Sequence, residues 1–139
     1  MNDSTFSGRC FCGHVRYELT GEPMFACHCH CESCRRTAGA AFLTWVSFGR
    51  DGLALTSGTI AEYRSSPGVR RGHCAVCGTT ITYWWDKRPG EIDIAVASLD
   101  DTTGIEPSAH IWVEDKPAWL VISDDLPQYK TTVSAGEMI

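Results

Sequence analysis

The sequence predicts a mostly β fold made of short strands, and three observations support this. Apolar side chains alternate with polar ones at a period of two in several segments, as in half-buried strands. Other segments are dense in aromatic and β-branched residues, which favour strands. Turn-forming residues separate these segments at intervals of about 8 to 12 residues, the spacing typical of an all-β domain.

The first half of the chain contains the clearest alternation and the one expected helical turn. Val15, Tyr17 and Leu19 alternate with polar neighbours and predict a strand with one buried face. Residues 32–39, directly after a cysteine cluster, are the one place where a helical turn is expected. Residues 42–48 are apolar and rich in aromatic or β-branched side chains, so they predict a further strand.

The rest of the chain repeats the pattern of a short β-forming segment followed by a turn. The turn sequences Ser57-Gly58 and Ser65-Ser-Pro67-Gly68, and the break at residues 86–90, separate these segments. The remaining expected strands are residues 53–56, 60–64, 79–85, 92–96 and 110–113.

Length and charge limit the classes of function. A chain of 139 residues suits a single domain, residues 1–139, and it carries a formal net charge of -5. Such an acidic chain is a poor binder of nucleic acid or of anionic membranes, so neither is expected as a partner. No segment resembles a transmembrane span, and residues 1–6 lack the basic and then apolar pattern of a signal peptide. We therefore expect a cytoplasmic protein, whose thiols stay reduced.

All eight cysteines fall in three short clusters, at residues 10–12, 27–34 and 74–77, with the spacing of zinc ligands. The first and third clusters combine a C-x-C pair with a C-x-x-C pair, which together can close a structural four-thiolate site. Sulfurs on one tetrahedral zinc lie about 3.8 Å apart, so the backbone must curl at each pair. Gly13 and Gly78 directly follow these pairs and permit such a curl. The predicted ligands of this structural zinc are Cys10, Cys12, Cys74 and Cys77.

The second cluster predicts a different kind of site. Cys29, Cys31 and Cys34 supply three sulfur ligands in six residues, and three protein ligands with an open position are typical of catalytic zinc. Two zinc ions per chain are therefore expected. Together they would bring the net charge to about -8, because four thiolates with one zinc add -2 and three add -1.

Neighbouring residues leave alternatives open at this second site. Cys27, His28 or His30 could close the coordination shell and make the site structural, although a second curl at Cys27 would have no glycine nearby. His73 and His110 are expected to pack with one hydrogen bond each, and the five tryptophans to pack in the core and at its rim. Arg35 and Arg36 follow Cys34. They are either a solvated pair, or they offset the negative charge of the site and bind an anionic substrate.

Four motifs, in order along nearly the whole chain, resemble the glutathione-dependent formaldehyde-activating family, whose fold also appears in centromere protein V. They are Gly8-Arg-Cys-Phe-Cys-Gly13-His-Val15, Cys29-His-Cys-Glu-Ser-Cys-Arg-Arg36 with Gly39, Ser65-Ser-Pro-Gly-Val-Arg-Arg-Gly-His-Cys-Ala-Val-Cys-Gly-Thr79, and a tail from Pro107-Ser-Ala-His-Ile-Trp112 through Lys116 and Trp119 to Leu126-Pro-Gln-Tyr129. Two departures from the family pattern are the extra thiol of Cys27 and a histidine, His73, where an aromatic residue is more usual.

The resemblance implies a zinc-containing Mss4-like, or β-tent, fold of short antiparallel strands. It implies a structural zinc on the first cysteine set and a catalytic zinc on Cys29, Cys31 and Cys34. To this site we add Arg35 and Arg36 as our own candidates for binding a glutathione carboxylate. The implied activity is that of a carbon–sulfur lyase that joins a glutathione-like thiol to formaldehyde or a related aldehyde. The alternatives are a non-catalytic zinc scaffold that binds a protein, a module that binds nucleic acid or chromatin, and a thiol redox sensor in which Cys27 is the resolving thiol for a labile zinc site.

Overall fold

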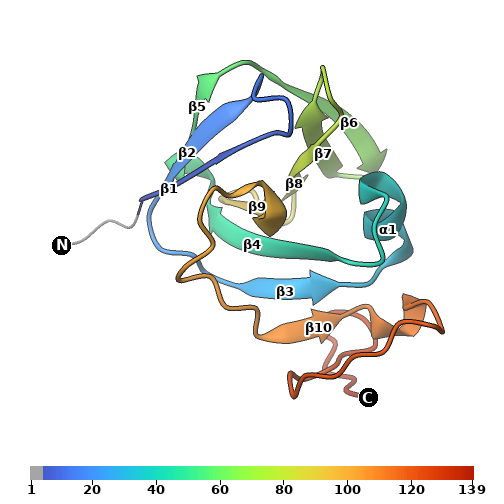
Figure 1. The fold of residues 1–139 in the computed structure, drawn as a ribbon. Coiled ribbons are helices and arrows are strands. Elements are labelled where there is room, and N and C mark those ends of the chain that lie inside the picture. The colour runs from blue at the N-terminus through green and yellow to red at the C-terminus, as the bar shows by residue number, and fades with distance from the viewer. Residues whose placement is uncertain (1–4) are drawn as a thin grey trace.

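The structure, a computed structural model, describes residues 5–139 and is built mainly of strands (Figure 1). The only α-helix in this range is α1 (Glu32–Ala38), and three short 3-10 turns are η1 (Arg50–Gly52), η2 (Val96–Ser98) and η3 (Val113–Asp115). The strands are β1 (Thr5–Arg9), β2 (Arg16–Thr20), β3 (Ala26–Cys29), β4 (Leu43–Gly49), β5 (Leu53–Ser57), β6 (Ile60–Ser66), β7 (Val69–Cys74), β8 (Thr80–Trp85), β9 (Glu91–Ala95) and β10 (Ala109–Ile111).

The strands form two sheets, and neither closes on itself. The smaller sheet has the order β1-β2-β5, and the larger has the order β10-β3-β4-β9-β8-β7-β6. An isolated bridge between Gly8 and Leu99 connects β1 to the chain just beyond η2. Figure 1 shows β10 beside β3, with the C-terminal segment running along β10. The amides of His110 and Tyr129 take part in this contact, since His110 N donates to Pro127 O and Tyr129 N to His110 O.

The mostly β prediction is confirmed, and the expected strands lie within two residues of those observed. The alternation at Tyr17 and Leu19 is confirmed, because both side chains are buried on one face of β2. The helical turn is confirmed as α1, which ends at Gly39 with a left-handed φ of 63°. The strand expected at 110–113 ends earlier, because Trp112 has a positive φ of 57° and η3 follows it.

Two features differ from the expectation. One strand pair is not antiparallel: β10 runs parallel to β3, with His110 beside His28. The chain reaches β10 by a crossover through η2 and a loop rather than by a hairpin, so it returns in the same direction. In addition, β1, β3 and β7 were not expected as strands, because their short sequences carry cysteine, arginine and histidine instead of a regular apolar alternation.

The core lies in two parts on opposite faces of β4. Val46 and Phe48 face the smaller sheet and pack with Leu19 and Ile94 in the main core. Leu43 and Trp45, on the other face, pack with Cys29, Cys34 and Ala95 in a second cluster. The second cysteine cluster is therefore part of a hydrophobic core. Within residues 5–139, no helix is long and apolar enough to cross a lipid bilayer. The expectation that residues 1–6 are not part of a signal peptide concerns residues 1–4 as well, and these lie outside the described range.

Gly8 packs tightly against the Tyr17 ring and the backbone of η2, and we predict that Gly8→Ala destabilises the protein. A Cβ at this position would lie 2.3 Å from the Tyr17 ring and 2.6 Å from the backbone oxygen of Ser98. The Tyr17 hydroxyl is hydrogen-bonded to Ser98 and cannot move freely. Overpacking of this kind costs about 1–3 kcal/mol. Denaturant unfolding measures the loss, and Gly49→Ala is the control, since a Cβ there meets nothing within 4 Å. Equal midpoints for the two variants would contradict this account.

Candidate metal centres

The first candidate centre joins the two sheets. Cys10 and Cys12 lie in the turn between β1 and β2, whereas Cys74 ends β7 and Cys77 lies in the turn between β7 and β8. The four sulfur atoms lie within 4.8 Å of one another. The separations Cys10 Sγ to Cys12 Sγ and Cys12 Sγ to Cys74 Sγ are 3.6 Å and 3.9 Å. They bracket the separation of about 3.8 Å expected for two sulfurs on one tetrahedral zinc. This set could hold a metal ion.

The two turns of this centre have matching backbones. The Cys10 amide donates to Val15 O at 3.1 Å, and the Cys74 amide donates to Thr79 O at 3.0 Å. Gly13 and Gly78 have φ values of 82° and 81°, so the predicted role of glycine in each curl is confirmed.

Each turn also directs backbone amides toward sulfur. Val15 N lies 3.2 Å from Cys10 Sγ, and Val76 N and Cys77 N lie 3.3 Å and 3.4 Å from Cys74 Sγ. Hydrogen bonds from Thr79 lower the pKa of the Cys77 thiol to about 5. Amide and hydroxyl donors favour the charged thiolate, which is the form that binds metals.

The second candidate centre is built from one short stretch of chain. Cys29 ends β3, Cys31 caps the N-terminus of α1, and Cys34 lies in the first turn of that helix. The Cys34 amide donates to Cys31 Sγ at 3.2 Å, so the cap itself brings two of the sulfurs together. The three sulfurs lie within 4.8 Å of one another, and no further Cys, His, Asp or Glu ligand atom from residues 5–139 joins this group.

Donors from distant strands surround Cys34. Arg71 of β7 is 5% exposed and points both of its terminal nitrogens at Cys34 Sγ, at 3.7 Å and 3.8 Å. The indole N–H of Trp45 donates to the same sulfur at 3.4 Å. Arg71 is held in turn by Ser65 Oγ at 3.1 Å and Thr37 Oγ1 at 3.3 Å. Its guanidinium also lies over the Tyr83 ring, 5.0 Å from the centroid.

These contacts make Cys34 the most acidic thiol of the second centre. Hydrogen bonds from Cys29 and Cys31, together with that from Trp45 and the charge of Arg71, lower the pKa of Cys34 to about 2. Hydrogen bonding with the other two thiols, together with burial, raises the pKa of Cys29.

Sequence reasoning missed the roles of Arg71 and Trp45. From the sequence alone, no role is expected for Arg71, and Trp45 is expected to take part in packing. Their distance from Cys34 along the chain conceals the contact, since Arg71 is 37 residues away.

The alternative fourth ligands lie elsewhere. Cys27 is buried, and burial raises its pKa to about 12. It shares a face of β3 with Cys29, but its sulfur does not join the three that lie within 4.8 Å of one another. His28 and His30 lie on the opposite face of β3 from Cys29, because side chains alternate along a strand. His28 Nδ1 is 2.8 Å from Thr44 Oγ1, and His30 Nε2 is 2.9 Å from His110 Nδ1.

His110 forms more hydrogen bonds than the single one expected for it. It is 4% exposed, and its Nε2 contacts the Asp124 carboxylate at 2.9 Å and 3.1 Å. If Nε2–H donates to Asp124, then Nδ1 accepts from Nε2–H of His30, and His30 Nδ1 is left as a bare acceptor. That atom is the one buried side-chain nitrogen or oxygen without a partner in the described part of the chain. His73 packs against the Tyr63 ring at 5.9 Å.

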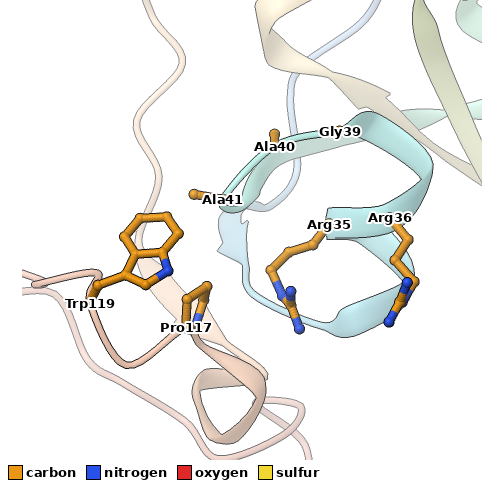
Figure 2. A pocket seen from close by; sticks show the side chains of 7 residues that line it. All are labelled: Arg35, Arg36, Gly39, Ala40, Ala41, Pro117 and Trp119. Atoms are coloured by element: carbon orange, nitrogen blue, oxygen red, sulfur yellow. The ribbon is translucent and has the colours of Figure 1, made fainter.

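Arg35 and Arg36 line a recess rather than the cysteine cluster. Figure 2 shows both on α1, with Pro117 and Trp119 on a separate segment. All four residues line a cavity of about 370 Å³. Arg35 Nε donates to His30 O at 3.3 Å, and Arg36 pairs with Glu32 at 2.8 Å while remaining 76% exposed. Neither arginine has a hydrogen bond to a cysteine sulfur among the described contacts. The charge next to the sulfurs comes from Arg71.

Comparison with known proteins supports one family. The sequence model described as glutathione-dependent formaldehyde-activating enzyme matches residues 5–115, which include all eight cysteines. A search of curated proteins finds no match. A crystal structure of a Rhodobacter sphaeroides protein superposes with a TM-score of 0.55 at 24% sequence identity, covering 73% of this chain and 91% of that one. This likeness concerns the fold alone. Because the sequence match spans most of the chain and both cysteine centres, the protein belongs to the glutathione-dependent formaldehyde-activating enzyme family.

Proposed function

We propose that this chain is a zinc-dependent carbon–sulfur lyase that forms or breaks an S-hydroxymethyl adduct of glutathione or a related thiol. It would have a β-tent, Mss4-like fold and hold two zinc ions, a structural one on Cys10, Cys12, Cys74 and Cys77 and a catalytic one on Cys29, Cys31 and Cys34. The observation that carries the proposal is the second centre, where three sulfurs converge without a fourth protein ligand from residues 5–139. Sets of three protein ligands are typical of catalytic zinc.

The reaction needs a thiolate nucleophile at neutral pH. In the synthetic direction, the thiol sulfur forms a bond to the aldehyde carbon, the C=O π pair moves to oxygen, and the S–H proton is replaced by an O–H proton. Zinc at the second centre would lower the pKa of a coordinating substrate thiol. The chain's own contribution is to hold three sulfurs together and to supply donors that stabilise their negative charge.

Charge explains the need for Arg71. Three thiolates and one divalent ion sum to -1, and the buried guanidinium beside Cys34 brings the local sum to 2 - 3 + 1 = 0. A substrate thiolate would be repelled by a site with a net charge of -1, whereas a site with no net charge would admit it. We assign Arg71 the role first considered for Arg35 and Arg36, that of offsetting the charge of the centre.

Arg35 and Arg36 fit the second role considered for them, that of binding an anionic substrate. They line the recess of about 370 Å³ with Pro117 and Trp119. A guanidinium binds carboxylates with two parallel hydrogen bonds, and glutathione carries two carboxylates. We propose that this recess receives a carboxylate of the thiol substrate, with Trp119 covering its apolar stem.

The direct test measures exchange between glutathione and its hydroxymethyl adduct at equilibrium, because the two reactants also combine without a catalyst. Exchange NMR with formaldehyde present should show a rate that rises in proportion to protein concentration. Metal-free protein should give the uncatalysed rate. The adduct of 2-mercaptoethanol, which has no carboxylate, should be accelerated less. No acceleration with either thiol would overturn the proposal.

Arg71→Gln tests the charge argument. We expect the KM for glutathione to rise about tenfold or more, since the buried positive charge is lost. In cobalt-substituted protein, the sulfur-to-cobalt charge-transfer band should shift, because its energy depends on donors to Cys34 Sγ. Arg70→Gln is the matched control, as Arg70 is exposed on the same strand and lies over Trp84. Equal effects of the two variants on KM and on the band would contradict the assignment.

One observation favours a non-catalytic zinc scaffold as a second candidate. Phe11 and Val76, at the tips of the two turns of the first centre, are 86% and 69% exposed. If these two side chains form one contiguous apolar patch, that patch would be a candidate protein-binding surface. The scaffold predicts no acceleration in the exchange experiment and no effect of glutathione on the cobalt spectrum.

A further inference from the structure

A third group of ligand side chains lies apart from both cysteine centres. One ring nitrogen each of His28 and His110 and a carboxylate oxygen of Asp124 lie within 4.8 Å of one another. His28 comes from β3 and His110 from β10, side by side in the parallel register. Asp124 comes from the C-terminal segment that runs along β10 (Figure 1). All three lie on the face of β3 that is turned away from Cys29.

Each histidine has one ring nitrogen held by a neighbouring residue. The second nitrogen of His28 is available, whereas the second nitrogen of His110 contacts Asp124. The Thr44 hydroxyl lies 2.8 Å from His28 Nδ1. Among residues 5–139, no residue forms a hydrogen bond with His28 Nε2. His110 Nδ1 is 2.9 Å from His30 Nε2, and His110 Nε2 lies against the Asp124 carboxylate. Metal-binding histidines usually have the second ring nitrogen fixed by a hydrogen bond, which orients the ring and sets its tautomer.

We propose that His28, His110 and Asp124 form a third metal site, which takes a divalent first-row transition ion such as Zn²⁺ or Co²⁺. Two imidazole nitrogens and one carboxylate oxygen are a donor set that such ions accept, with water completing the shell. Thr44 and His30 orient the two rings. The site does not depend on the proposed lyase activity.

The geometry requires a small closure and an internal shift of protons. Nitrogens on one tetrahedral zinc lie about 3.4 Å apart, whereas the ligand atoms of this group lie within 4.8 Å of one another. Small side-chain rotations that move these atoms by about 1 Å would therefore bring them to bonding positions. The metal takes the place of the proton between His110 Nε2 and Asp124. That proton moves to Nδ1 of His110, which then donates to His30 Nε2, and the His30 proton moves to Nδ1. Both rings stay neutral, and no proton is lost to solvent.

This arrangement makes the third site weaker and more exchangeable than the two sulfur centres. His30 Nδ1 would carry an unpaired buried N–H in the loaded form, because it has no partner among the described residues. Asp124 has a side chain that is 46% exposed, which gives the ion a route from solvent.

Metal stoichiometry tests the site. The full chain is equilibrated with excess Zn²⁺ held by a weak buffer ligand, and bound zinc is counted by mass spectrometry against protein concentration. We expect three zinc ions per chain in the wild type and two in His28→Gln and Asp124→Asn, with affinity for the third ion falling at least tenfold. With Co²⁺, the third equivalent should add d–d absorption without further sulfur-to-cobalt charge transfer.

Asp125→Asn is the matched control, because Asp125 is exposed, follows Asp124 directly in the chain and carries the same charge. It should keep three ions. Two ions in the wild type, or equal loss in Asp124→Asn and Asp125→Asn, would overturn the proposal and leave the cluster as a hydrogen-bonded Asp-His-His chain. If His28→Gln does not fold, the two aspartate variants still decide the question. Failure of the lyase proposal would be seen separately, since the histidine and aspartate variants leave the cysteine centres intact.

Discussion

Cys74→Ser is expected to prevent stable folding. Cys74 is fully buried, and its sulfur receives two backbone amides and lies 3.9 Å from Cys12 Sγ, on the other turn of the centre. The contact joins residues 62 apart in sequence, and closing a loop of that length costs about 4 kcal/mol of chain entropy. Structural zinc on thiolates contributes on the order of 10 kcal/mol, comparable with the whole stability of a small domain, about 5–15 kcal/mol. Without the metal, the turns that join the two sheets would separate.

Circular dichroism, denaturant unfolding and metal content measure this effect. Cys27→Ser is the matched control, because it makes the same substitution at a buried cysteine outside both sulfur sets. The free energy of unfolding of the control should fall by about 1–3 kcal/mol, and the control should keep both metal ions. A folded Cys74→Ser protein with the same unfolding midpoint as the control would show that the first centre does not hold the sheets together.

Cys31→Ser is expected to lose the second metal ion and the activity while remaining folded. Cys31 caps α1 by accepting from the Cys34 amide at 3.2 Å, and serine is itself a preferred N-cap, so the helix should keep its start. The three ligands lie within six residues of one another, so losing the ion does not release distant parts of the chain. Loss of a ligand should reduce the rate of adduct exchange by about 100-fold or more.

The measurements are metal content, thermal unfolding and the exchange rate with glutathione. We expect one ion in place of two on the cysteine centres, and a midpoint close to that of the wild type. If Cys31→Ser unfolds as readily as Cys74→Ser, the second centre is structural. If it retains full exchange activity, the three-sulfur cluster is not the catalytic site.

Much of the fold was predictable because its signals are local. The alternation of Val15, Tyr17 and Leu19 buries one face of a strand, and this holds whatever lies against that face. Gly13 and Gly78 were predictable because the C-x-C and C-x-x-C pairs require a curl that glycine allows. Strands β3 and β7 were not predictable in this way, because their short sequences lack a regular alternation of apolar and polar side chains.

The sequence by itself predicted two sets of converging cysteines, since their spacing limits how thiolates can converge on one ion, but it left open whether Cys27, His28 or His30 joins the second set. It also indicated the mostly β class and the helical turn at α1. Only the tertiary structure decided that Arg71 and Trp45 lie on Cys34, that Arg35 and Arg36 line a recess, and that β10 runs parallel to β3 beside His28. The physical reason is distance along the chain: ligand spacing is set within a few residues, whereas the charge around a ligand is set by whichever strands the sheet order brings next to it.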